Sequence, residues 1–293
     1  MYKLVCIDMD GTLLNKQHEV SLENKKALKE ALDKGVRIAI STGRVYPTIE
    51  IYSKLLGINV DVICSNGAYI KERDSGDVVL QSTLSEKLFN KIYELIKKYN
   101  FLAYFDTLEV IISETKIPSN DSYRLMNSWV NEEKIKLYEV SDFREAFRDK
   151  KHSILKVILI QTLTSKSFEE AKDDLIEISC TGDIVHSWNG ALEIMEKGTT
   201  KGNAVQMLAK KLNIKKEEIM CIGDSGNDLS MLNEAGLAVV MGNAEDDIKK
   251  YADFITDSNE NSGVAMAINK FILNNGVSIP KIGYGVFRVT DLS

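Results

Sequence analysis

The chain has 293 residues, of which 44% are hydrophobic and 27% are charged, and its formal net charge is −6. This composition is typical of a globular protein with one large domain or two of ordinary size. The acidic balance argues against a nucleic-acid partner, which needs clustered lysine and arginine, and no apolar run is long enough to span a membrane. The run before Asp8 is also too short for a signal peptide.

Strands and helices alternate along the first part of the chain. Predicted strands lie at 3–7, 36–40 and 60–64, and amphipathic helices lie between them at 21–34 and 47–56. Ser21 is a predicted N-cap, and glycines stop both helices. Because the strands are nearly continuous valine and isoleucine runs, they predict a parallel sheet that is covered on both faces.

The middle of the chain has a different pattern. Helices are predicted at 84–99, 120–132, 142–149 and 168–178, and strands at 101–113 (turning near Thr107) and 155–161. Residues 184–195 read as a hairpin that turns at Asn189-Gly190, a strong turn signal. This region is therefore predicted to be an α+β insert.

The alternation resumes near residue 201. The predicted elements are helices at 201–212, 228–235, 245–251 and 263–273, and strands at 219–222, 237–241 and 254–256. We predict an α/β protein with a Rossmann-like, doubly wound parallel-sheet core and an inserted α+β cap domain. Residues 1–84 and 188–275 form the core, residues 85–187 form the cap, and 276–293 are a tail of unknown role.

Three of the four cysteines lie inside apolar runs, and the chain has no CxxC pair. Cys6, Cys64 and Cys221 are therefore predicted to be buried free thiols rather than parts of a disulfide framework. Such thiols are typical of a reducing compartment, so the sequence favours a cytoplasmic location.

Four polar clusters follow predicted strands. Ligands of parallel α/β sheets bind outside the carboxyl ends of the strands, so these clusters are expected to converge in space. The first is Asp8-Met9-Asp10-Gly11-Thr12. Two carboxylates at the end of a buried strand are costly without a compensating charge, and Mg²⁺ prefers such ligands together with a phosphate. The alternative for this cluster alone is a solvated turn.

The next two clusters carry groups that suit a phosphate. Ser41-Thr42-Gly43-Arg44 offers a hydroxyl and a glycine amide beside a helix start, although a plain capped turn explains it equally well. Lys201 opens a helix, where a cation is unfavourable unless an anion is near. A solvated lysine is the alternative, and Lys197 competes for the same role.

The fourth cluster is Gly223-Asp224-Ser225-Gly226-Asn227-Asp228. Asp224 is predicted to complete a metal site with Asp8, and Asp228 to be a further ligand or to orient one. Asn227 is a candidate hydrogen-bond donor to a phosphate oxygen. An EF-hand loop is disfavoured because no glutamate occupies its twelfth position.

Together the clusters resemble the haloacid dehalogenase-like superfamily, and within it the Cof-type phosphatases. The resemblance covers residues 1 to about 275 and includes DMDGTLL, STGR, SNGA, LEIMEKGTTKGNAV, GDSGND and GNA. The family's fold is the capped α/β fold described above. The resemblance implies a Mg²⁺-dependent phosphatase acting on a small phosphate monoester, such as a sugar phosphate, pyridoxal phosphate or flavin mononucleotide.

The resemblance also implies residue roles. Asp8 is the nucleophile that forms an aspartyl-phosphate, and Asp10 is the general acid and base. Mg²⁺ is held by Asp8, Asp224 and the backbone carbonyl of Asp10, with Asp228 as a ligand or a supporting carboxylate. The phosphate is held by Thr42, Gly43, Lys201, Asn227 and the Met9 amide. Three residues are candidates for lying near the substrate: Arg44, Asn66 and Asn243.

Three other functions are alternatives at this point. A phosphotransferase or phosphomutase would pass the phosphoryl group from Asp8 to a hydroxyl rather than to water. A catalytically silent phosphate-binding protein is disfavoured because Asp8, Asp10, Lys201 and Asp224 are all present. A receiver domain is disfavoured by the DxDGT spacing and the large insert. The sequence leaves the oligomeric state unknown.

Overall fold

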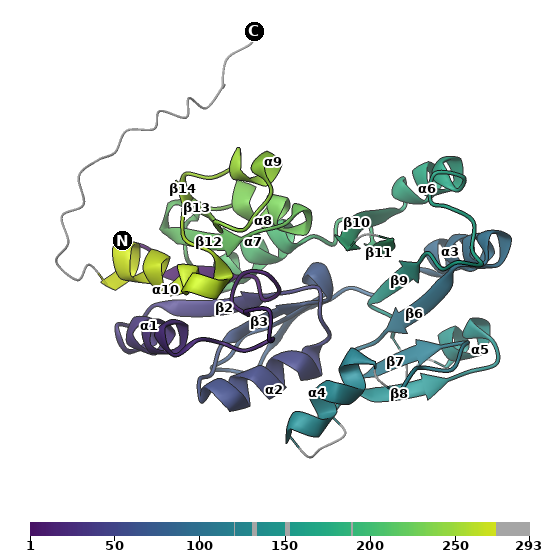
Figure 1. Ribbon diagram of the computed structural model, residues 1–293, viewed down its shortest axis with the longest axis horizontal. Helices are drawn as coiled ribbons and strands as arrows, with labels where there is room; N and C mark the ends of the chain where they lie inside the picture. The colour runs from purple at the N-terminus through teal and green to yellow at the C-terminus, as the bar shows by residue number, and fades with distance from the viewer. Residues whose placement is uncertain (120, 131–133, 150–152, 189, 274–293) are drawn as a thin grey trace, which may run out of the picture.

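The computed structural model describes residues 1–119, 121–130, 134–149, 153–188 and 190–273. These residues form two lobes that lie side by side, each built on its own sheet (Figure 1). The predicted tail, 276–293, lies outside the described residues. None of the helices in the described part of the chain has the length and apolar character needed to cross a membrane.

The first lobe, the core, contains an eight-stranded sheet in the order β14-β13-β12-β1-β2-β3-β4-β5. Its strands are β1 (Leu4–Ile7), β2 (Arg37–Ser41), β3 (Asp61–Cys64), β4 (Tyr69–Lys71), β5 (Val78–Gln81), β12 (Ile219–Gly223), β13 (Leu237–Val240) and β14 (Phe254–Ile255). The six strands from β14 to β3 are parallel to their neighbours. This part of the sheet confirms the predicted doubly wound α/β core.

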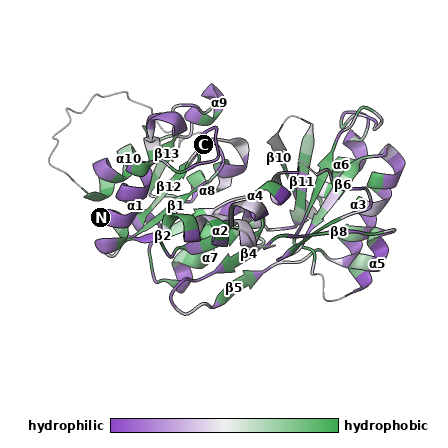
Figure 2. Ribbon diagram, turned by 60° about the horizontal axis from the view of Figure 1, so that its bottom comes forward, coloured by the Kyte–Doolittle hydropathy of each residue, from purple (hydrophilic) through white to green (hydrophobic). Residues whose placement is uncertain are grey.

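Both faces of the core sheet are covered, as its apolar strands require. In β1, Val5 and Ile7 point into one apolar cluster, and Leu4 and Cys6 point into the opposite one. The first face packs against α1 (Leu22–Asp33), α2 (Tyr46–Leu56) and α10 (Gly263–Ile268). The second packs against α7 (Lys201–Lys211) and α8 (Leu229–Asn233), and α9 (Asp246–Lys249) lies beside it. The strands are green against the purple outer faces of the helices (Figure 2).

Local signals explain where the core helices begin and end. Ser21 is the N-cap of α1, and its side chain accepts a hydrogen bond from the backbone amide of Asn24. Gly57 ends α2 with a left-handed φ of 64°, a conformation that favours glycine. Both features agree with the sequence prediction.

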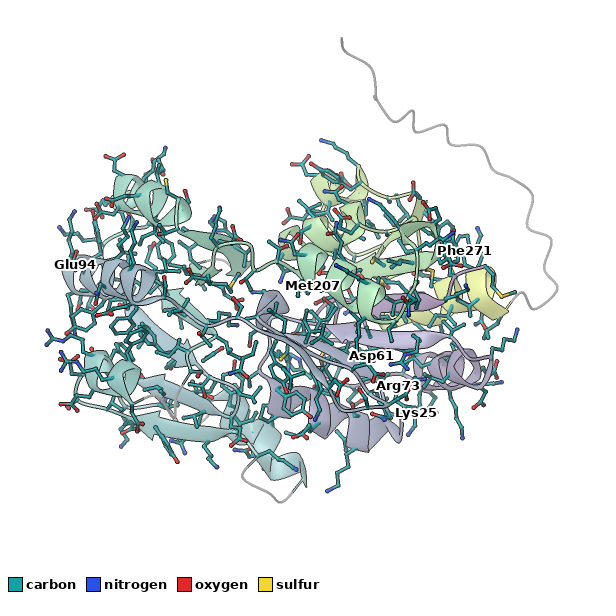
Figure 3. The ribbon with its side chains drawn as sticks, turned by 180° about the vertical axis from the view of Figure 1, so that it is seen from behind. Lys25, Asp61, Arg73, Glu94, Met207 and Phe271 are labelled. Carbon is teal, nitrogen blue, oxygen red and sulfur yellow. The ribbon has the colours of Figure 1, made fainter. Side chains whose placement is uncertain are left out.

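The core sheet also has an antiparallel edge that the sequence did not predict. The strands β4 and β5 pair with β3 and with each other in antiparallel fashion. At this edge Asp61 accepts a hydrogen bond from the backbone amide of Arg73 at 3.0 Å, and the two residues lie close together in Figure 3. Because β4 has only three residues, its alternation is too short to stand out in a sequence.

The second lobe, the cap, contains a six-stranded sheet in the order β10-β11-β9-β6-β7-β8. Its strands are β6 (Leu102–Asp106), β7 (Val110–Ser113), β8 (Lys136–Glu139), β9 (Lys156–Ile160), β10 (Gly182–Trp188) and β11 (Ala191–Glu196). Its helices are α3 (Glu86–Tyr99), α4 (Ser122–Val130), α5 (Phe143–Arg148) and α6 (Lys172–Ser179). The predicted helix at 168–178 was wrong in its first turn, and β8 was not predicted.

The predicted boundary between residues 187 and 188 is too early. Residues 191–196 form β11, which pairs with β9 and β10 inside the cap sheet. The chain returns to the core only through residues 197–200, between β11 and α7. It leaves the core through residues 82–85, between β5 and α3. The two crossings touch, because the hydroxyls of Ser82 and Thr199 are 2.9 Å apart and the Ser85 amide donates to Glu196.

Candidate active site

A cavity of about 720 Å³ lies where the carboxyl ends of the core strands face the cap. Its core side includes Asp8, Thr42 and Asp224, which follow β1, β2 and β12 respectively. Its cap side includes Tyr104 of β6 and Ile158 of β9. Three of the four polar clusters that the sequence singled out therefore converge on one cavity.

Lys201 lies beneath this cavity and joins two of the clusters. Its Nζ donates to Asp8 Oδ1 at 2.6 Å and to Asp228 Oδ1 at 2.7 Å, and all three side chains are buried. Burial lowers the pKa of Lys201, but the carboxylates of Asp228 and Asp8 outweigh it and raise that pKa above its usual value. The competing candidate Lys197 instead pairs with Asp183 at 2.9 Å, and its side chain is largely exposed.

Three carboxylates gather around this one ammonium group. Single oxygens of Asp8, Asp224 and Asp228 all lie within 4.8 Å of one another. Burial, and then the charge of Asp228, raise the pKa of Asp224 to about 6 and that of Asp8 well above its usual range. A hard divalent cation would relieve this repulsion, so the donor set fits Mg²⁺.

Short contacts hold the members of this acidic group in place. Thr12 Oγ1 donates to Asp224 Oδ1 at 2.7 Å. Asp228 Oδ2 accepts from the backbone amides of Asp224 and Ser225 at 3.0 and 3.1 Å. Gly11 has a φ of +79°, and a Cβ there would overlap the Asp224 carboxylate. The Asp8–Thr12 turn thus fits directly around Asp224.

Asp10 lies in a different environment from Asp8. Its side chain is about half exposed, and Arg44 Nε donates to its Oδ2 at 2.7 Å. Both residues line the cavity together with His18. The two carboxylates of the DxD motif are therefore separated, with Asp8 against Lys201 and Asp10 against Arg44.

The remaining predicted residues differ in their distance from the cavity. Thr42, Gly43 and Asn227 line it, whereas Met9 has its side chain buried in the core. Asn66 and Asn243 are not among the described residues that line it. Asn243 Nδ2 donates to the Gly11 carbonyl at 2.9 Å, and its Oδ1 accepts from the backbone amide of Asn259. Its amide is thus used to join two loops.

A buried charged cluster from the cap meets the core here, and the sequence analysis missed it. Lys156 Nζ donates to the Gly43 carbonyl at 2.6 Å and lies 3.1 Å from Glu193 and 3.4 Å from Asp106. Asn66 Nδ2 donates to the other oxygen of Glu193. The signal was a lysine inside the apolar run ILKVILI and a glutamate inside ALEIM, since strands rarely bury charges without partners.

Comparisons with known proteins agree with this geometry. A family profile described as haloacid dehalogenase-like hydrolase matches residues 5–268. Phosphatase YwpJ of Bacillus subtilis (strain 168) is 32% identical over 290 residues, covering 90% of this chain and 97% of that protein. From the same organism, 5-amino-6-(5-phospho-D-ribitylamino)uracil phosphatase YcsE is 31% identical, covering 92% and 96%.

A solved structure is similar over the same range. A haloacid dehalogenase-like hydrolase from B. subtilis superposes with a TM-score of 0.80 at 31% identity, covering 92% of this chain and all of that one. The profile match, the sequence relatives and the shared fold all span both the core and the cap. This chain therefore belongs to the haloacid dehalogenase-like hydrolase family.

Proposed function

We propose that this protein is a Mg²⁺-dependent phosphatase that hydrolyses small phosphate monoesters through an aspartyl-phosphate on Asp8. The observation that carries the proposal is the buried bridge from Lys201 to Asp8 and Asp228, with Asp224 beside it at the base of the cavity. A carboxylate nucleophile needs a charge-balanced environment to approach an anionic phosphate, and this arrangement supplies one. The two curated relatives named above are phosphatases, which supports the same reaction.

The reaction has two steps. In the first, a carboxylate oxygen of Asp8 attacks phosphorus, the bond to the ester oxygen breaks, and Asp10 gives its proton to the leaving alcohol. In the second, Asp10 takes a proton from water as that water attacks phosphorus. Inorganic phosphate leaves and the Asp8 carboxylate is regenerated. Because Asp10 is about half exposed and lines the cavity, it suits this exchange with the leaving group and with water.

The residues around Asp8 have distinct parts in this proposal. Asp8, Asp224 and the backbone carbonyl of Asp10 would hold Mg²⁺, and Asp228 would orient Lys201 and the loop of Asp224. The bound ion would screen the repulsion between Asp8 and the phosphate. The phosphoryl oxygens would be held by the following groups: Thr42, the Gly43 amide, Lys201, Asn227 and the Met9 amide.

The cap bears on where the reaction takes place. Cap residues line the side of the cavity that faces the strand ends, and a cap that covers the site would exclude bulk water from the reacting phosphate. Cys6, Cys64 and Cys221 are buried free thiols, which supports a reducing, cytoplasmic setting for the enzyme.

The test is phosphate release from a panel of monoesters with Mg²⁺ and with excess EDTA. The panel contains p-nitrophenyl phosphate, glycerol 3-phosphate, sugar phosphates, pyridoxal phosphate and flavin mononucleotide. We expect metal-dependent release from the native protein and none from Asp8→Asn, which keeps the shape of the side chain and removes the nucleophile. If folded Asp8→Asn turned over at the native rate without deamidating, the assignment of Asp8 would be wrong. Transfer of the phosphoryl group to an added alcohol rather than to water would identify a phosphotransferase.

A further inference from the structure

The cap sheet has two faces of different character because side chains alternate along each strand. On one face, Phe105 and Val157 pack into the apolar cluster of the cap. On the other, Tyr104, Ile158 and Ile160 line the cavity. Tyr104 is the direct cross-strand partner of Ile158. The inner face of the cap sheet therefore lines the same cavity as Asp8 and is available to a leaving group.

The permanent cations of this cavity already have partners. Lys156 is 1% exposed and contacts Asp106, Glu193 and the Gly43 carbonyl. Arg44 is paired with Asp10. Each ammonium or guanidinium group thus has an anionic partner within the protein.

Carboxyl groups also outnumber these cations. Among the described residues that line the cavity, Arg44 and Lys156 face five carboxyl groups: Asp8, Asp10, Asp121, Glu193 and Asp224. The charge of a cation bound at Asp8 and Asp224 would be balanced by the phosphate group that is transferred. Among the described residues that line the cavity, a second anionic group on the substrate would therefore meet carboxylates and no unpaired permanent cation.

Besides the charged Asp121, Lys156 and Glu193, the cap lines this cavity with apolar and aromatic side chains. This apolar wall is made by the following residues: Tyr104, Tyr123, Leu125, Met126, Ile158 and Ile160. Tyrosine and isoleucine side chains offer flat apolar surface against which a ring can pack. The cavity of about 720 Å³ is large for a three-carbon phosphate and suits a drug-sized ligand.

We infer that this wall is a subsite for an uncharged, ring-bearing leaving group. The preferred substrates are monophosphate esters of an alcohol that carries an aromatic or heteroaromatic ring. Esters whose leaving group holds a second phosphate or a carboxylate are disfavoured. This inference rests on the proposed phosphatase activity and names the substrate class of the same site.

The first test compares kcat/KM of the native protein with Mg²⁺ for three kinds of ester. Flavin mononucleotide represents the uncharged ring esters, glycerol 3-phosphate the small neutral ones, and fructose 1,6-bisphosphate and 3-phosphoglycerate the anionic ones. We expect the ring ester to exceed both anionic esters by at least about tenfold. Anionic esters that match the ring ester would overturn the inference and leave the phosphatase proposal standing. No release from any ester would instead count against the phosphatase proposal.

The second test adds a positively charged side chain to the wall of the cavity. Ile160→Lys places an ammonium group on the cavity wall, and Leu163→Lys adds the same charge at a fully exposed cap position. We expect Ile160→Lys to shift the ratio of kcat/KM between fructose 1,6-bisphosphate and flavin mononucleotide by about tenfold towards the bisphosphate. Leu163→Lys should leave that ratio unchanged. An equal ratio in both folded variants would contradict the inference.

The third test removes aromatic surface, so that the result does not depend on the folding of Ile160→Lys. Tyr104→Ala should lower kcat/KM for flavin mononucleotide by about tenfold or more, with glycerol 3-phosphate little affected. Tyr138→Ala is the matched control on β8, since Tyr138 does not line the cavity. If Tyr104→Ala lowered kcat/KM equally for both esters, the wall would not discriminate in favour of ring-bearing leaving groups.

Discussion

Lys156, on a strand of the cap, donates a 2.6 Å hydrogen bond from its Nζ to the carbonyl oxygen of Gly43, in a core loop that lines the cavity. The ammonium is 1% exposed, so this bond forms away from water. A charge-assisted hydrogen bond in such a setting is stronger than a neutral one. We therefore consider Lys156 a positioning residue that fixes the Thr42-Gly43 loop against the cap.

Replacement of this lysine should affect stability and catalysis separately. Lys156→Met leaves Asp106 and Glu193 buried without their cation, which should cost about 3–5 kcal/mol in urea unfolding. The triple variant Lys156→Met, Asp106→Asn, Glu193→Gln removes all three charges and should regain most of that stability. Its KM should remain above that of the native protein, and its kcat/KM should be lower by up to about 100-fold, because the Gly43 carbonyl still lacks its hydrogen-bond donor. If the triple variant had the KM and kcat/KM of the native protein, the cluster would have a purely structural role.

The buried carboxyl of Asp106 should make stability depend on pH. Burial raises its pKa to about 6, because the repulsion from Glu193 adds to desolvation and Lys156 only partly offsets them. Between about pH 4 and 6 the folded protein keeps a proton on Asp106 that the unfolded chain has released. This contribution is therefore present at low pH and is lost as the pH rises through about 6.

The shift corresponds to roughly 3 kcal/mol. Asp106→Asn cannot titrate, so the free energy of unfolding of the native protein minus that of the variant should fall by up to this amount from pH 4 to pH 7. Urea unfolding of both proteins at several pH values measures this difference. A difference that stayed flat across the range would show that Asp106 is ionised at all of these pH values.

The hydroxyl of Thr12 should affect the Mg²⁺ concentration that the enzyme needs for activity. It donates to Asp224 Oδ1 at 2.7 Å and so fixes the orientation of a proposed Mg²⁺ ligand. Thr12→Val keeps the shape and removes the donor, and should raise the Mg²⁺ concentration for half-maximal activity by about 10- to 100-fold. Activity at saturating Mg²⁺ should largely return. Thr181→Val, in the cap, is the control and should leave the Mg²⁺ titration unchanged.

Two glycines offer a matched pair for testing the fit around Asp224. Gly11 and Gly35 have nearly the same positive φ, +79° and +81°, so alanine should cost each about 1 kcal/mol of backbone strain. A Cβ at Gly35 meets no atom within 4 Å, whereas one at Gly11 overlaps the Asp224 carboxylate. Gly11→Ala should therefore lose activity and Mg²⁺ binding, and Gly35→Ala should lose only stability. Normal Mg²⁺ titration by Gly11→Ala would show that the turn can move away from Asp224.

The core could be predicted from the sequence because its signals are local. Apolar runs at 3–7 and 36–40 are long enough to be recognised as strands, and Ser21 and Gly57 mark helix ends by their own chemistry. The polar clusters follow these runs, so the parallel sheet brings them to one edge without further information. Asp8 and Asp224 were singled out in this way, and Lys201 by its place at the start of a helix.

The parts that could not be predicted depend on tertiary pairing. The strand at 191–196 was assigned to the core, because nothing in its own residues says which sheet it joins. The edge strand at 69–71 is too short to show alternation. Lys156 and Glu193 are far apart in sequence, and only the pairing of β9 with β11 in the cap sheet brings them together.

The two crossings between the lobes restrict how the cap can move. Each has four residues, 82–85 and 197–200, and they are tied to each other by Ser82, Thr199 and Glu196. Two short tethers that are bonded to each other at one point favour tilting of the cap over sliding of the cap along the core. Because one tether leads directly into Lys201, the pivot lies beside the residue that holds Asp8. Any tilt of the cap about these tethers would therefore displace Lys201 and Asp8 less than the groups on the far side of the cavity.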